Sequence, residues 1–128
     1  MAQKAIEVIL MRQLASHLSM PVFIVDPEGS VIFFNEPAEI MLGRRFEETG
    51  EMPPAELAAL FSSGNPEAAG VEPAELPITR ALRDHRPVCG ALSLTGSDNR
   101  RRQVEVTAIP IIGQGERHLG AVAFVHVS

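Results

Sequence analysis

Five runs of the chain carry the apolar pattern of β-strands. Residues 22–25 and 31–34 are apolar throughout, and residues 88–95, 103–112 and 118–127 place apolar side chains at alternate or nearly continuous positions. Such runs, bounded by Gly, Pro, Asn and Asp, predict strands. Three segments between the second and third runs have apolar residues three and four positions apart, which predicts helices beginning near residues 36, 53 and 77.

The charged stretch 44–52 between the first two of these helices predicts an irregular connection. The order is therefore two strands, three short helices and three strands. This order is typical of an α+β fold with an antiparallel sheet.

A separate helix is predicted ahead of the sheet, over residues 2–18. Ile6, Leu10, Leu14 and Leu18 recur every four residues, and other apolar residues beside them widen the stripe. Two interpretations remain open and are compatible with each other: the helix lies on its own sheet, or it pairs with a second copy. We therefore divide the chain into an N-terminal amphipathic helix, 1–20, and a domain, 21–128, and take these four residues as the candidate dimer interface.

Three of the predicted strands are apolar on both faces. They are 22–25, 31–34 and the last strand. An antiparallel sheet with one wet face should alternate between apolar and polar residues instead. The face away from the three helices is therefore expected to be covered by the N-terminal helix, a second subunit, or both. This pattern predicts a homodimer in which the helix and the outer sheet face meet.

Composition narrows the class of protein. The 128 residues fit one domain, and their 45% hydrophobic content suffices for a core. The net charge of −5 does not favour nucleic acid as a partner. A single cysteine excludes an internal disulfide and suits a reducing cytoplasm. No apolar run approaches the roughly 20 residues of a membrane span. We expect a cytoplasmic protein with no membrane span.

The segment from residue 21 to 43 holds the most specific pattern. Asp26-Pro27-Glu28-Gly29 predicts a tight turn, Asn35 a helix N-cap, and Gly43 a helix stop. This spacing resembles the D-x-x-G-x-I-x-x-x-N-x-A opening of PAS domains (sensory boxes), carried here by Asp26, Gly29, Val31, Asn35, Ala38, Leu42 and Gly43. The resemblance covers about Pro21 to Ser128. It implies a five-stranded antiparallel sheet of order 2-1-5-4-3, with short helices on one face.

The resemblance also implies a function. PAS domains usually sense signals or bind partners and rarely catalyse. We therefore expect a sensory or regulatory module of a signal-transduction protein such as a two-component system. It would mediate dimerisation, bind a small apolar ligand and control a linked or separate effector, for example a histidine kinase, phosphatase or nucleotide cyclase. The alternative is a constitutive protein-interaction domain that binds no ligand. No catalytic residues are expected.

A ligand would lie between the sheet and the short helices, as in the family. The same side chains would serve equally well as a closely packed core. Their apolar character favours an apolar ligand over a polar one. The candidate lining residues are Phe23, Val25, Phe33, Met41, Leu57, Phe61, Ile78, Leu82, Leu92, Val106 and Phe124.

Cofactor and metal sites find little support in the sequence. His85 is the one candidate for a haem ligand, but its place just before Arg86-Pro87 at a helix end favours a surface position. The sole cysteine, Cys89, begins a strand, whereas a flavin-binding light-oxygen-voltage domain needs a cysteine in a mid-domain helix, so we expect Cys89 to be a packed small side chain. The four histidines are scattered, so no metal site is expected.

Overall fold

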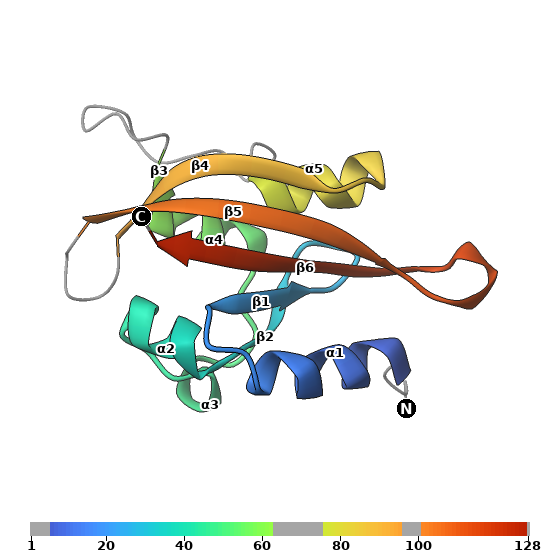
Figure 1. Ribbon diagram of the computed structural model, residues 1–128, viewed down its shortest axis with the longest axis horizontal. Helices are drawn as coiled ribbons and strands as arrows, with labels where there is room; N and C mark the ends of the chain where they lie inside the picture. The colour runs from blue at the N-terminus through green and yellow to red at the C-terminus, as the bar shows by residue number, and fades with distance from the viewer. Residues whose placement is uncertain (1–5, 63–75, 96–100, 128) are drawn as a thin grey trace.

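One antiparallel sheet forms the centre of the computed structural model, which describes residues 6–62, 76–95 and 101–127. Its strand order in this part of the chain is β2-β1-β6-β5-β4-β3 (Figure 1). The strands are β1 (Val22–Val25), β2 (Val31–Phe34), β3 (Phe61–Ser62), β4 (Val88–Thr95), β5 (Arg101–Ile112) and β6 (His118–Val127).

The five predicted strands stand in the predicted order, which confirms the expected fold class. The sequence pattern missed the two-residue β3, whose Phe61 and Ser62 pair with Leu94 and Ser93 at the edge of the sheet. Such a short strand depends on its neighbour for pairing and carries no periodicity of its own.

The helices are α1 (Ile6–Ser16), α2 (Glu36–Leu42), α3 (Phe46–Thr49), α4 (Pro54–Leu60) and α5 (Pro77–Asp84), followed by a 3₁₀ turn, η2 (Gln114–Glu116). The expectation of an irregular 44–52 segment was wrong, because α3 lies within it. Tertiary contacts make this turn helical: a Glu39 carboxylate oxygen accepts a hydrogen bond from the Phe46 N–H at 2.8 Å. The Phe46 ring also packs edge-on against Phe34, with ring centroids 5.3 Å apart.

The turn and cap residues of the sequence motif hold the first hairpin and α2. The Asp26 carboxylate accepts hydrogen bonds from the Glu28 and Ser30 N–H groups, each at 3.0 Å. Gly29 has φ +91° and Gly43 has φ +75°, values that a residue with a Cβ rarely adopts. Gly43 ends α2 by donating its N–H to the Glu39 carbonyl at 2.8 Å.

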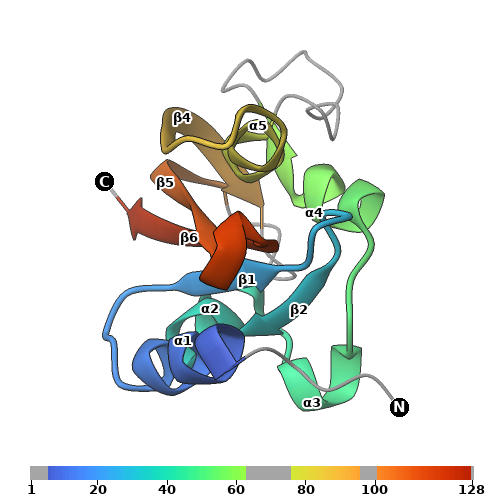
Figure 2. The same cartoon turned by 90° about the vertical axis from the view of Figure 1, so that its right-hand side faces the viewer.

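Two apolar clusters lie on opposite faces of the sheet. The larger, inner cluster includes Phe23 and Val25 from the sheet and buried residues of α2, α4 and α5. The smaller, outer cluster joins Val8 and Ala15 of α1 to Ile24 and other residues of β1, β5 and β6. Figure 2 shows α4 and α5 on one side of the curved sheet and α1 beside β1 and β2.

Some predictions fall outside the described residues. They include the first positions of the N-terminal helix, 2–5. The sequence also predicts a loop over 65–75, rich in Pro, Gly and Ala, and a turn at 96–99, and both lie outside the described residues too. The predicted end of that helix at residue 18 is two residues too long, because α1 ends at Ser16. Among the described helices, none has both the length and the apolar character needed to span a membrane.

Candidate functional site

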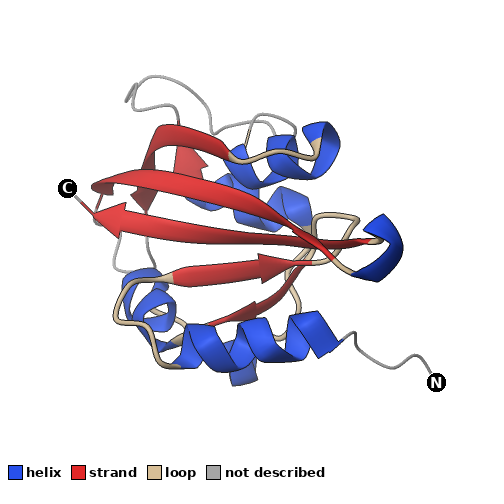
Figure 3. Ribbon diagram, turned by 45° about the vertical axis from the view of Figure 1, so that its right-hand side comes forward, coloured by secondary structure: helices blue, strands red, loops and turns tan. Residues whose placement is uncertain are grey.

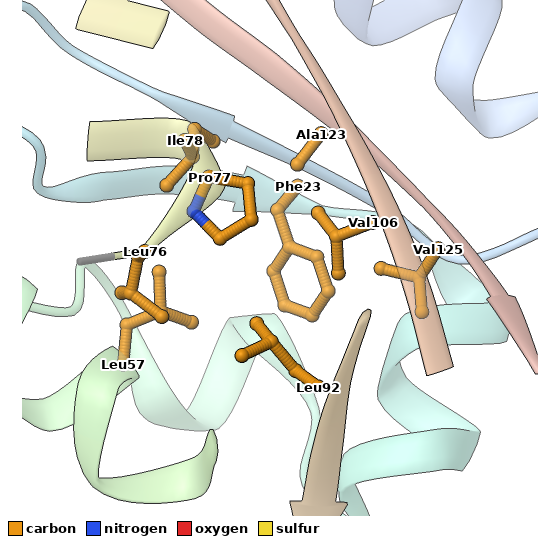
Figure 4. A pocket seen from close by; sticks show the side chains of 9 residues that line it. All are labelled: Phe23, Leu57, Leu76, Pro77, Ile78, Leu92, Val106, Ala123 and Val125. Atoms are coloured by element: carbon orange, nitrogen blue, oxygen red, sulfur yellow. The ribbon is translucent and has the colours of Figure 1, made fainter. Parts of the chain in front are cut away.

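An apolar cavity lies between the sheet and the helices on its inner face. Its wall is almost wholly apolar and is formed by β1, β4, β5, β6, α4 and the start of α5 (Figure 4). The Phe23 ring points into the space that Leu57, Leu92 and Val106 surround. The full lining is Phe23, Leu57, Leu76, Pro77, Ile78, Leu92, Val106, Ala123 and Val125.

Five of the eleven candidate ligand residues meet in this wall: Phe23, Leu57, Ile78, Leu92 and Val106. Three more belong to the surrounding core without lining the cavity. Val25 and Met41 are buried there, and Leu82 is half-buried against it. The side chain of Phe61 lies outside the part that the structure describes.

Phe33 and Phe124 lie on the other face of the sheet, packed in the outer cluster with α1. For Phe33 the cause is that β2 is apolar at all four positions, so the sequence does not show which side chains point inward. The inward residue is Phe34, which pairs with Phe23, whereas Phe33 pairs with the outward Ile24. For Phe124 the cause is the strand's two apolar faces, which hide the alternation that would tell them apart. The residues of β6 that line the cavity are Ala123 and Val125, which the sequence analysis missed.

The cavity is small. Its volume is about 20 Å³. A cavity of about 10–15 Å³ suffices for one water, whereas sites for small molecules measure about 300–1,000 Å³. Close packing of α5 on β4 helps to keep it small, since a Cβ added at Gly90 would stand 3.1 Å from the Pro77 ring. An apolar ligand would therefore have to displace α4 or α5 from the sheet.

A second candidate surface runs along α1 (Figure 3). The inward side of this helix packs on its own sheet through Val8 and Ala15, which are 5% and 1% exposed. The outward side carries Ile6, Leu10 and Leu14, which are 66%, 55% and 52% exposed. Of the four predicted interface residues, only Leu18 is half-buried against the outer cluster. The helix thus covers its own sheet and still presents an apolar stripe.

The outer face of the sheet is covered only in part. Val122 of β6 is buried in the outer cluster, but Ile109, its partner on β5, remains 39% exposed. Farther along this face, Cys89 and Ala91 of β4 are exposed. The expectation that Cys89 is packed was wrong, because its thiol lies on an uncovered part of the sheet, 3.6 Å from the Thr107 hydroxyl.

His85 lies at the surface and does not line the cavity. It ends α5 in the left-handed conformation, φ +55°, and its ring stacks on that of His118 with centroids 3.8 Å apart. Beside it, the Arg83 guanidinium donates to the Asp84 carboxylate at 3.2 Å and lowers the pKa of Asp84 below its ordinary value of 3.8. Within the described ranges, no three potential metal ligands come together.

The fold and the matched family model agree. A family model described as "PAS domain" matches residues 19–126. Among curated proteins, none matches the chain. Solved structures do match, but their sequence identities are so low that the likeness supports the fold alone. One is the PAS domain of a protein from Colwellia psychrerythraea, with TM-score 0.70, 16% identity, and coverage of 94% of this chain and 96% of that one.

Two further structures show the same likeness. The PAS domain of nitrogen regulation protein NR(II) from Vibrio parahaemolyticus has TM-score 0.63 and 18% identity, covering 93% of this chain and 98% of that one. The Rhodobacter sphaeroides LOV protein has TM-score 0.72 and 15% identity, covering 96% of this chain and 68% of that one.

Proposed function

Because the chain belongs to the PAS domain family, whose members are typical sensor modules of signal transduction, we propose that it is a regulatory module that acts through homodimerisation. The observation that carries this proposal is the outward side of α1. Ile6, Leu10 and Leu14 stay more than half exposed although the helix already packs on its own sheet. Three large apolar side chains in one row on a helix are the pattern of a helix that meets a partner.

The size of this stripe sets what else the interface must contain. Burying a Leu or Ile side chain fully is worth about 1.5–3 kcal/mol, so completing the burial of a half-exposed one is worth about 1 kcal/mol. Six such side chains in a symmetric pair give about 6 kcal/mol, less than the 8.2 kcal/mol of a micromolar dimer even before the cost of association. The uncovered outer sheet face around Ile109 should therefore join the interface.

The apolar cavity is the proposed site for a small apolar ligand. Its lining supports this chemistry, and its small volume requires α4 or α5 to move when a ligand enters. A ligand that binds the open arrangement better would shift the population toward it and so reach a linked effector. The closed cavity also supports a second candidate function, a constitutive interaction domain that holds no ligand.

The dimer is tested by light scattering on the wild type and on the double variant Leu10→Glu, Leu14→Glu. Because both side chains are exposed, the variant should fold normally while the two carboxylates prevent apolar pairing. The wild type should be dimeric at about 100 µM and the variant monomeric, with the dimer dissociation constant raised at least tenfold. Ile40→Glu is the matched control, because Ile40 is 73% exposed on α2 and lies outside the stripe. A wild type that stays monomeric, or an equal effect of the control, contradicts the proposal.

The two candidate functions are separated by mass spectrometry of the denatured protein after purification. A co-purified apolar molecule, lost when Leu57→Trp fills the cavity, supports a ligand-binding module. A protein that dimerises and releases no molecule supports the constitutive domain.

A further inference from the structure

One buried amide joins α1 to the rest of the domain. Asn35 is 2% exposed and stands between the end of β2 and the start of α2. Its side-chain oxygen accepts hydrogen bonds from the Val22 N–H at 3.0 Å and the Ala38 N–H at 3.2 Å. Its side-chain nitrogen donates to the Ala15 carbonyl at 2.8 Å and the Met20 carbonyl at 3.0 Å.

These four bonds use the full capacity of the group. A carboxamide offers two N–H donors and an oxygen with two lone pairs, and each has a partner here. The two acceptor bonds hold the start of β1 and the first turn of α2. One donor bond reaches the Ala15 carbonyl in the last turn of α1, which also accepts the Leu18 N–H at 3.2 Å. The other reaches the Met20 carbonyl in the segment after the helix. The two halves of one side chain therefore serve two different parts of the fold.

The remaining hold on α1 is limited. Within this helix, Val8 and Ala15 are the buried residues. Met11 is half-buried, and the Arg12 guanidinium lies over the Phe33 ring, 4.8 Å from its centroid. With so few buried side chains, the buried bond to Ala15 and the part-buried bond to Met20 are a large share of what keeps the helix and the segment after it docked. Ala15, one of the two buried residues, is itself an acceptor of the Asn35 amide.

We propose that Asn35 is a latch that sets the docked position of α1 and so regulates its dimer face. This inference rests on the proposed dimerisation through α1. With the donor bonds formed, α1 lies on the outer face and its stripe is presented as a fixed surface. A shift of α2, whose Ala38 and Leu42 are buried in the inner cluster, moves the amide and weakens those bonds. The latch therefore connects packing on the inner face to the helix on the outer face.

The variant Asn35→Asp separates the two halves of the latch. Asp has the same shape and remains a good N-cap, so the bonds from Val22 and Ala38 persist. It has no N–H, and its second oxygen faces the carbonyls of Ala15 and Met20, so the α1 bonds are lost and replaced by repulsion. Amide hydrogen exchange in α1 should rise at least tenfold relative to the wild type, while exchange in β5 and β6 changes much less. The dimer dissociation constant should rise by a similar factor.

Val104→Ala is the matched control, since Val104 is a buried inner-cluster residue of β5 that is not part of the latch. It should lower overall stability without opening α1 selectively. If Asn35→Asp does not fold, Asn35→Ser takes its place, because serine keeps the cap for Ala38 but is too short to reach both carbonyls.

If Asn35→Asp leaves amide hydrogen exchange in α1 unchanged, the proposed latch is wrong. It is also wrong if the variant opens α1 selectively but leaves the dimer dissociation constant unchanged. A wild type that is monomeric at all concentrations refutes the proposed dimer instead. The exchange comparison alone then decides whether Asn35 holds α1, with selective opening supporting it.

Discussion

Gly120 is the position where we expect an added methyl group to lower the stability of the fold most. It lies in β6 opposite Ile111 of β5, and its φ is +131°. A Cβ built there would stand 2.0 Å from the Val25 carbonyl oxygen and 3.1 Å from its carbon. Both contacts are with backbone, so no side-chain rotation relieves them. Gly120→Ala must therefore separate β6 from β1 or change the local backbone.

The expected cost has two parts. Holding a residue with a Cβ in this sparsely populated region of backbone space costs about 1–3 kcal/mol. Shifting well-packed backbone to admit an extra carbon costs about 1–3 kcal/mol more. We expect Gly120→Ala to lower the free energy of unfolding by about 2–6 kcal/mol, a large part of the 5–15 kcal/mol that holds a typical domain together.

Urea unfolding followed by far-ultraviolet circular dichroism measures this loss, since the chain has no Trp or Tyr for fluorescence. Gly115→Ala is the matched control. Gly115 also has positive φ, +68°, but a Cβ there meets nothing within 4 Å. It isolates the backbone part, which should cost about 1–2 kcal/mol. If the two variants lose the same stability to within about 0.5 kcal/mol, the close approach to Val25 is not what requires glycine.

Two further results are expected. The Arg83 hydrogen bond and the nearby Arg86 and Arg80 charges lower the pKa of Asp84. The contribution of Asp84 to stability is therefore full above pH 3.8 and is lost as the pH falls through the lowered pKa. Urea midpoints between pH 2 and 5 should fall less for Asp84→Asn than for the wild type, and parallel curves would contradict this. The exposed Cys89 thiol should react completely with a disulfide reagent in the native protein. Its reaction should be severalfold slower at protein concentrations where the dimer forms, because the outer face of β4 is then covered. A reaction rate that does not depend on protein concentration would place Cys89 outside the interface.

Local sequence patterns were sufficient for the strands and for most helices. The runs at 22–25, 31–34, 88–95 and 118–127 coincide with strands in the structure. The Asp26 turn, the Asn35 cap and the Gly43 stop are local devices, formed by hydrogen bonds or backbone angles within a few residues. These signals do not depend on distant parts of the chain, so they can be read from the sequence. The strand order came from the family resemblance.

The candidate site was predicted less well. The inward face of β6 was misassigned because residues 119–125 form a continuous apolar run, in which Phe124 and Val125 are equally apolar. The exposed His126, which shares the face of Phe124, was the one polar signal in this part of the strand that marks the outer side. The choice of Phe124 was off by one position, and in a strand one position changes the face. The same holds for β2, which is apolar at all four positions and in which Phe34, not Phe33, points inward. The volume of the cavity depends on how closely Pro77 approaches Gly90, which involves two segments paired only in the folded state.

The kind of module follows from local signals along the chain. Alternation, turn residues and caps act within a few positions, and they specify an α+β domain with an amphipathic helix ahead of it. How that helix is used depends on contacts between distant parts of the folded chain. The tertiary structure shows α1 packed through Val8 and Ala15, its other side exposed, and its last turn held by the Asn35 amide. An amphipathic pattern specifies that a helix has an apolar side, but a broad stripe can be shared between two partners. Contacts across the fold decide that division.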